Sequence, residues 1–257
     1  MKVTIDVLKS VPENAAFYYE QAKRAKKKIE GAKKAYEETL KRIELAESRK
    51  KKEKIVLEAR KKHWFEKFRW FISSDNKVVV GGSDATTNDI LVKKYAEKGD
   101  LIFHTQLPGS PFVIIKGDGK EIKKEEIEEA AIFCASMSKS WSAKATTADV
   151  YYIKPEQVKK EFGLPKGSFM IYGQRTYLRP ILELGCGVWN DIIPMCGPLT
   201  AIKKHCKKVI IITQGDLKKS DAAKKIRYIL EKAEKVHIDL DEIMHILPPG
   251  DCTIKEM

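Results

Sequence analysis

The sequence lacks any run of 18 consecutive apolar residues, which excludes a membrane-spanning helix by hydropathy. Its first 14 residues lack the apolar core of a signal peptide, so we expect a cytoplasmic protein with no membrane partner. The chain has 257 residues, of which 43% are hydrophobic. That is enough for one large or two modest domains with a real core.

Cysteines are few, and none forms the C-x-x-C pair that a zinc site uses on a tight turn. Three of the five recur at ten-residue intervals, a spacing that brings no two ligands together. We therefore expect neither a metal nor a cofactor, and free thiols in a reducing compartment. The cysteines are Cys134, Cys186, Cys196, Cys206 and Cys252.

Motifs of the common enzyme classes are also absent, since there is no G-x-S-x-G, H-E-x-x-H or P-loop pattern. His104 follows an apolar run and lies near Asp100 in sequence, so the two offer a pair for acid–base chemistry. No nucleophile or metal completes the set, and we expect a non-catalytic protein. The competing interpretation is an enzyme acting on nucleotides or RNA with His104, Asp84 and Asp100 in one cleft.

Glycines give one weak signal for a dinucleotide site. Gly185-Cys-Gly187 follows the strand-like segment 181–184 and is similar to the start of a phosphate-binding loop. The third glycine and the following helix are missing, which argues against such a site.

No proline occurs between Asn14 and Phe71, and the sequence predicts one long helix there. A short strand is predicted before it, from Val3 to Val7. The apolar seam along one face of this helix is interrupted over residues 47–54, and the interruption is either a stutter in one helix or the turn of a helical hairpin. We favour the single helix because Ser48 is the only weak helix former in that stretch. The apolar seam has the 4-3 spacing of a coiled coil and comprises Tyr18, Ala22, Ala25, Ile29, Ala32, Tyr36, Ile43 and Ala46.

Positive charge is concentrated in this helical region. The chain carries a formal net charge of +13, and residues 1–70 hold 21 lysines or arginines against 11 acidic residues. A solvated coiled-coil face is one explanation, but the excess of one sign favours a phosphate-lined partner. The alanine-rich seam also needs a packing partner, either a second copy of the chain or a helix that this sequence does not contain.

Residues 64–116 show the pattern of a polyanion-binding sheet edge. An aromatic-rich helix end is predicted to lead into a strand over Lys77–Val80, then a glycine pair and a polar turn to Asp89. A short basic helix and a strand ending at His104 follow. This order places backbone N–H donors and lysines together at one edge of a sheet.

The rest of the sequence mixes strands and helices, which predicts an α+β (mixed α/β) fold. The long N-terminal coiled-coil helix precedes a mixed-sheet domain and a smaller C-terminal α/β domain. The predicted elements are a helix over 120–143, a strand over 148–153, a hairpin of 168–173 with 176–178, a helix over 200–206, a strand over 209–213, a helix over 218–233 and a short helix near 241–246.

Several polar residues fall at turns or element ends, where their side chains can reach RNA. We expect Lys93, Lys94, Lys139, Lys144 and Arg175 to neutralise phosphates. Asp84, Asn88 and His104 are expected to fix the polar loops or hydrogen-bond RNA, and capping of the helix near Asn88 is equally plausible for the first two. Tyr95, Trp141, Tyr172 and Tyr177 are candidates for stacking on unpaired bases.

Four segments in this order resemble the RNA-binding module of the NFACT proteins, the ribosome-associated quality-control factors called NEMF in animals and RqcH in bacteria. The helix that follows Asn14 is similar to the middle coiled coil of that family, and the tail is more loosely similar to its C-terminal domain. The four segments are Trp64–Ser74, Gly81–Asp89, Lys98–His104 and Gly167–Gly173, and those of the tail are Thr213–Lys219 and Ile246–Gly250.

The resemblance implies a basic coiled-coil arm at 1–63, an RNA-binding domain at 64–180 and a C-terminal domain at 181–257. Its implied partners are tRNA, ribosomal RNA and the large (60S or 50S) ribosomal subunit that holds a stalled nascent chain. In some members, tRNA recruitment drives template-free extension of that chain. The family's large N-terminal domain has no counterpart here, which implies a fragment or half of a split system. A separate N-terminal half or self-dimerisation would then supply the missing strand of the coiled coil.

Two departures from the family pattern bear on the site. Ser83 stands where the family usually has arginine, which removes one possible phosphate contact. Thr105 and Gln106 follow His104 where the family often has Ala-Asp, which weakens an acid–base role for that histidine. A third interpretation makes the chain an adaptor whose coiled coil binds protein.

Overall fold

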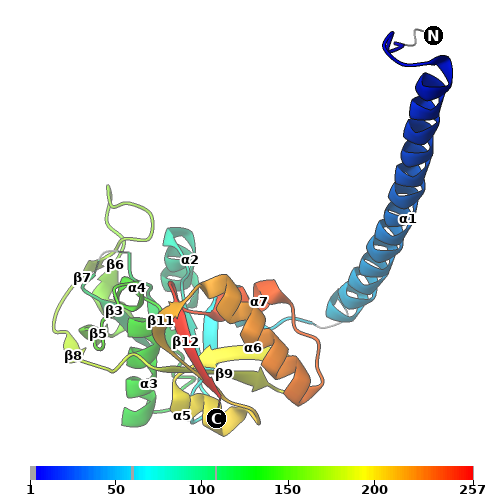
Figure 1. Ribbon diagram of the computed structural model, residues 1–257. Helices are drawn as coiled ribbons and strands as arrows, with labels where there is room; N and C mark the ends of the chain where they lie inside the picture. The colour runs from blue at the N-terminus through cyan, green and yellow to red at the C-terminus, as the bar shows by residue number, and fades with distance from the viewer. Residues whose placement is uncertain (1–3, 59–60, 108, 257) are drawn as a thin grey trace. The chain divides into compact units, whose positions relative to one another are not determined.

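The structure is a computed structural model that describes residues 4–58, 61–107 and 109–256. The chain divides into two compact units, residues 1–61 and residues 62–257 (Figure 1). The first is helical and the second combines antiparallel sheets with helices, which confirms the α+β fold class.

The first unit is helix α1, Val11–Glu58. Its start is fixed by the side chains of its first turn: Glu13 accepts hydrogen bonds from Ser10, and the Asn14 amide donates to the carbonyls of Asp6 and Lys9. These bonds hold the preceding segment as a turn. The strand predicted from residue 3 is therefore wrong over its described part, residues 4–7.

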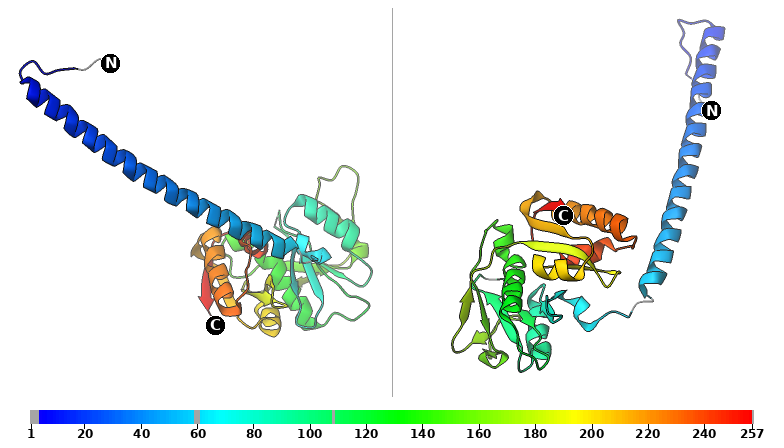
Figure 2. Two further views of the ribbon diagram at one scale, coloured as in Figure 1. Left: turned by 90° about the vertical axis from the view of Figure 1, so that its right-hand side faces the viewer. Right: turned by 90° about the horizontal axis from the view of Figure 1, so that it is seen from below.

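Helix α1 continues without a break through residues 47–54, as both views in Figure 2 show. The single long helix is confirmed and the hairpin is wrong. Its predicted extension to Phe71 is also wrong, because a 3₁₀ turn at Trp64–Lys67 and strand β1 at Arg69–Ile72 follow. Three consecutive side chains of β1 are buried, which a two-sided strand accommodates and the exposed face of a long helix does not.

The second unit contains a six-stranded antiparallel sheet with strand order β1-β2-β4-β3-β5-β8. Helix α3, Lys124–Ser136, packs on its central strands, and the single turn α4, Lys139–Ser142, follows α3. Helix α2, Ala85–Tyr95, follows β2 directly. The other strands are β2 Val78–Gly81, β3 Leu101–Thr105, β4 Val113–Ile115, β5 Val150–Ile153 and β8 Thr176–Leu178.

A four-stranded antiparallel sheet, with order β10-β9-β11-β12, forms the rest of this unit. The glycines of the weak dinucleotide signal lie inside β9, so that interpretation is wrong. They are required because a Cβ on Gly187 would come within 2.5 Å of the Cys206 side chain, just after α5. The elements are β9 Leu184–Trp189, β10 Ile193–Gly197, α5 Leu199–His205, β11 Ile210–Leu217, α6 Lys219–Glu234, α7 Leu240–Ile246 and β12 Cys252–Glu256, the last not predicted from sequence.

A two-stranded sheet pairs β6, Val158–Lys159, with β7, Met170–Ile171, after a 3₁₀ turn at Pro155–Gln157. The predicted hairpin between 168–173 and 176–178 is wrong, since β8 pairs with β5 instead. The Gln157 amide explains the separation, because it donates to the carbonyls of Tyr172 and Gln174, each at 2.8 Å, and fixes the turn between β7 and β8.

The two larger sheets share one hydrophobic core. β1 lies beside β10, and Thr200 of α5 donates to Glu129 of α3 at 2.7 Å. The predicted boundary at residue 180 falls between these sheets, and the division into an RNA-binding and a C-terminal domain stays a prediction. All five cysteines are buried and unbridged. Within the described residues, no helix has the length and apolar character to span a bilayer.

Candidate nucleic-acid interface

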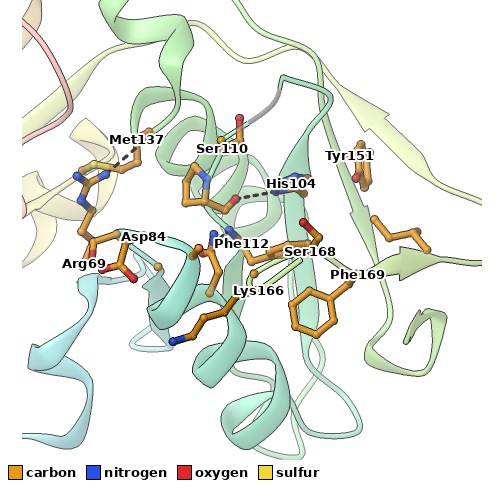
Figure 3. A pocket seen from close by; sticks show the side chains of 18 of the residues that line it. Arg69, Asp84, His104, Ser110, Phe112, Met137, Tyr151, Lys166, Ser168 and Phe169 are labelled. Atoms are coloured by element: carbon orange, nitrogen blue, oxygen red, sulfur yellow. Dashed lines mark hydrogen bonds between the residues drawn. The ribbon is translucent and has the colours of Figure 1, made fainter. Parts of the chain in front are cut away.

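A pocket of about 540 Å³ opens beside the six-stranded sheet (Figure 3). Segments far apart in sequence supply its walls, and they include β1, the start of α2, β3 with the β3–β4 loop, β5, the β6–β7 loop and the β7–β8 turn. Its lining is Arg69, Gly82, Ser83, Asp84, Ala85, Asn88, His104, Gly109, Ser110, Pro111, Phe112, Met137, Tyr151, Lys166, Gly167, Ser168, Phe169, Met170, Ile171 and Arg175.

One wall of this pocket is a continuous row of rings. His104 stacks on Phe112, with centroids 4.2 Å apart and ring planes 9° from parallel. The edge of Phe169 meets Phe112 at 5.4 Å, and Tyr151 lies 6.1 Å from His104 on the other side. Such a wall offers aromatic surface to a flat ligand.

Three cations face the same space. Arg175 lies over the ring of Tyr151, with its guanidinium carbon 4.8 Å from the centroid. Lys166 is exposed and makes no ion pair or hydrogen bond with any residue in the described ranges. Arg69 donates to the Met137 carbonyl at 3.3 Å, while its buried Nε finds no partner among the described residues. Burial lowers the pKa of Arg69, but a guanidinium keeps its charge in proteins.

His104 is held by its Nδ1 atom, which lies 2.9 Å from the carbonyl oxygen of Pro111. Because a carbonyl only accepts, Nδ1 carries the hydrogen. Burial lowers the pKa of His104 below its ordinary 6.5, and the nearby charge of Arg175 adds to that effect. The ring is thus neutral at pH 7.

Asp100 does not join His104. It lies before β3, where it accepts bonds from Lys116 Nζ at 2.7 Å and from the backbone N–H groups of Glu97 and Gly117 at 2.9 Å. His104 is four residues further along, about 13 Å at the rise of a strand. Of the three residues in the competing enzyme interpretation, Asp100 is therefore separated from His104, whereas Asp84 and His104 both line the pocket.

Asp84 and Asn88 fix the pocket's loops. Asp84 caps α2, accepting from the N–H of Thr87 at 2.8 Å, and this bond is the main reason that its pKa is lowered. Asn88 lies one turn into α2, where its side-chain oxygen accepts from the N–H of Phe112 at 3.0 Å. The capping prediction is thus confirmed for Asp84, while Asn88 ties α2 to the segment before β4.

The predicted phosphate-binding lysines are not equally placed. Lys139 lies beside the pocket. Its ammonium would be 3.3 Å from a Cβ placed on Gly109, which is one of the residues that line the pocket. Lys93 pairs with Asp89 at 2.5 Å, and Lys94 is exposed on the same helix. Lys144 pairs with Asp216 of β11 at 2.5 Å and is not part of the lining.

The backbone donors predicted at the glycines are already used. Gly82 donates to the Phe112 carbonyl at 3.0 Å, Gly167 to Asp89 at 3.3 Å and Ser168 to the Pro165 carbonyl at 3.1 Å. The backbone donor that the sequence predicts at the glycine pair is thus engaged within the protein at Gly82. The glycines instead allow close approach, because a Cβ on Gly82 would come within 2.0 Å of the side-chain oxygen of Asn88.

One of the four aromatic residues expected to stack on bases is buried instead. Trp141 is fully buried and donates from its indole to the Asp251 carbonyl at 3.1 Å, so it presents no face to a base. Tyr95 stacks on Trp64 with centroids 4.8 Å apart. Tyr172 and Tyr177 are exposed, as a stacking role requires.

Comparisons with known proteins identify the segment that contains this site. Residues 67–173 match the NFACT protein RNA binding domain, and so include every lining residue except Arg175. The chain is 38% identical over 215 residues to the archaeal Rqc2 homolog aRqcH of Methanocaldococcus jannaschii, covering 79% of this chain and 31% of that protein. This chain belongs to the NFACT family.

Other members give the same picture. The chain is 35% identical over 184 residues to the ribosome quality control complex subunit NEMF of Homo sapiens, covering 65% of this chain and 16% of that protein. It therefore spans about a third or less of the length of these NFACT relatives. A solved structure, the C-terminal of the fibronectin/fibrinogen-binding protein from Streptococcus suis, has 25% identity and a TM-score of 0.41, covering 44% of this chain and 45% of that one.

Two cations of the NFACT pocket were missed by the sequence analysis. Arg69 falls in the helix predicted to Phe71, although the alternation in Phe68-Arg69-Trp70 indicates a strand with Arg69 on the face opposite the two aromatic residues. Lys166 stands between a proline and a glycine in a tight loop, which is a signal for an exposed side chain at a fixed position.

Proposed function

We propose that this chain binds RNA and the large ribosomal subunit as part of a ribosome-associated quality-control factor that acts on stalled nascent chains in the cytoplasm. Its RNA partners are tRNA and ribosomal RNA, and the chain itself does no chemistry. The observation that carries the proposal is the pocket in the NFACT segment, where Arg69, Lys166 and Arg175 face one space.

The charge balance of the pocket supports an anionic ligand. Asp84 is its single carboxylate among the described lining residues, and that group is occupied as the cap of α2. Three cations against one engaged carboxylate attract phosphate at long range. The formal charge of +13 for the whole chain favours the same class of partner.

The names of the relatives support the cellular role. They are described as a Rqc2 homolog and as a subunit of the ribosome quality control complex. Because this chain spans only part of those proteins, it supplies part of their contacts with the ribosome. A second copy, or a separate N-terminal half of the factor, packs on the seam of α1, where Tyr18, Ile29, Tyr36 and Ile43 are exposed.

Co-sedimentation tests the proposal directly. The purified chain is expected to pellet with isolated large subunits more than with whole ribosomes, and less of it should pellet as salt rises. The matched variants are Arg175→Gln, at the pocket, and Lys207→Gln, an exposed lysine paired with Asp191 outside it. Only Arg175→Gln should weaken binding, because only that variant removes a cation from the pocket. Equal binding by both variants, or no binding to either particle, would contradict the proposal.

A further inference from the structure

We infer that the NFACT pocket holds a single unpaired ribonucleotide, with its base stacked on Arg175 and a base N–H donated to Nε2 of His104. This inference rests on the proposed RNA-binding function and adds to it the class of RNA recognised. It makes the site a reader of an exposed base rather than of duplex backbone.

The size of the pocket limits the ligand. A volume of about 540 Å³ lies in the range of sites that enclose one small molecule. The start of α2, the β3–β4 loop and the β6–β7 loop all contribute to its walls, with Asp84, Ser110 and Lys166 among the side chains drawn in Figure 3. A recess of this kind admits one nucleotide that leaves its strand, whereas a paired base stays in its stack.

Arg175 provides a platform for the base. Its guanidinium lies over the Tyr151 ring, and this cation–π contact restrains the group. The side chain is exposed, so its other face is open to a ligand. Arginine planes and aromatic rings are the surfaces on which proteins stack unpaired bases.

His104 provides an acceptor for the base edge. With Nδ1 donating to the Pro111 carbonyl and one ring face stacked on Phe112, the ring is fixed in one orientation and one tautomer. Its Nε2 then carries a lone pair and makes no hydrogen bond with the residues that the structure describes. A neutral acceptor such as this Nε2 favours a ligand that donates a hydrogen bond. Every unpaired base has an N–H group on its pairing edge.

Side chains bind the phosphate of the same nucleotide. The N–H groups of Gly82, Gly167 and Ser168 are bonded within the protein and so do not form a cradle for it. Lys166 stands on the β6–β7 loop without a partner in the described ranges and has the reach to neutralise that phosphate.

The inference is tested by fluorescence anisotropy with three eight-nucleotide RNAs at one salt concentration: oligouridine, its N3-methyl derivative and an abasic chain. All three carry the same phosphates. The methylated RNA can stack its bases but lacks the N3–H donor, and the abasic RNA can neither stack nor donate. The wild-type chain should bind oligouridine about tenfold more tightly than the methylated RNA, the effect of one hydrogen bond, and the abasic RNA least of all.

Variants assign the two contacts. His104→Phe keeps a ring on Phe112 but removes the acceptor, so its affinities for oligouridine and methylated RNA should be equal, and His104→Gln, which retains an acceptor, should restore part of the preference. Arg175→Lys should weaken the binding of oligouridine but not that of the abasic RNA. The same change at Arg179, outside the pocket, should alter neither affinity.

Equal wild-type affinity for the three RNAs would overturn the inference and leave RNA binding intact. Failure to bind any RNA, ribosomal RNA included, would instead refute the proposed function.

Discussion

Asp100 gives the sharpest test of whether the acidic residues near the NFACT site act in chemistry or in folding. It is 2% exposed, and its carboxylate accepts from Lys116 and from two backbone N–H groups. Replacing it with asparagine keeps the shape but removes the charge opposite a buried ammonium. Although burial favours the neutral amine, the bonds to Asp100 and Glu97 raise the pKa of Lys116, so the amine is charged at neutral pH.

The expected loss follows from these contacts. Breaking one partner of a buried ion pair removes about 3–5 kcal/mol of stability. Here Glu97 still accepts from Lys116 at 2.8 Å, so the loss should be near the lower limit, about 3 kcal/mol. For a unit of this size that corresponds to a fall in Tm of about 6–12 °C.

Thermal unfolding followed by circular dichroism measures this fall, and Glu97→Gln is the control. The Glu97 side chain is 73% exposed, and its removal should change stability by less than about 1 kcal/mol. At 20 °C, folded Asp100→Asn should bind RNA as the wild type does, because the pocket lies at the other end of β3. An unchanged Tm together with lost RNA binding would refute the structural role and support the enzyme interpretation.

Two further predictions concern buried ionisable groups. Because burial lowers the pKa of His104, the unfolded state takes up a proton first as pH falls, so stability should decrease below about pH 6.5 and continue to fall to the lower pKa of the folded state. His104→Phe should flatten that decrease in urea midpoints between pH 7.5 and pH 5.5, and an unaltered profile would contradict it. Lys77 and Glu126 pair at 2.7 Å and are both nearly inaccessible. Lys77→Met should lose about 3 kcal/mol or more, whereas adding Glu126→Leu should recover much of it in chemical denaturation. A double variant as unstable as the sum of the single ones would argue against the pairing.

The elements that sequence predicts well here are those with a strong local signal. Helix α1 has no proline after its first turn and keeps a 4-3 apolar seam from Tyr18 to Ala46, and the strands at 78–81, 101–105 and 150–153 are short apolar runs between turns. The cap at Asp84 is equally local, since an aspartate three residues before a threonine closes a first turn with side-chain bonds.

The failures are non-local. The absence of proline after residue 58 said nothing against helix, and only pairing with β2 makes Arg69–Ile72 a strand. The false hairpin at 168–178 has a good turn at Gly173, but the partners of its two strands are β6 and β5. Trp141 looked exposed because its neighbours are polar, yet it is covered by the end of the chain near Asp251. In each case a residue distant in sequence decides the structure.

Asp89 shows why even a well-placed motif does not reveal the role of each residue. It accepts from Gly167 of the β6–β7 loop and pairs with Lys160 of that loop and with Lys93, whose hydrogen bond is the main reason that the pKa of Asp89 is lowered to about 2. Its neighbour Asn88 holds the segment before β4. Two adjacent side chains of α2 therefore fasten two walls of the pocket, and Lys93 pairs with one of them in the free protein, so its phosphate-binding role stays a prediction. The sequence shows that Lys93 and Asp89 are four residues apart. It does not show that Asp89 also contacts Lys160 and Gly167, which lie more than 70 residues further along the chain. Among the cations that line the pocket, Lys166 and Arg175 are exposed, whereas Arg69 is part-buried and held by the Met137 carbonyl.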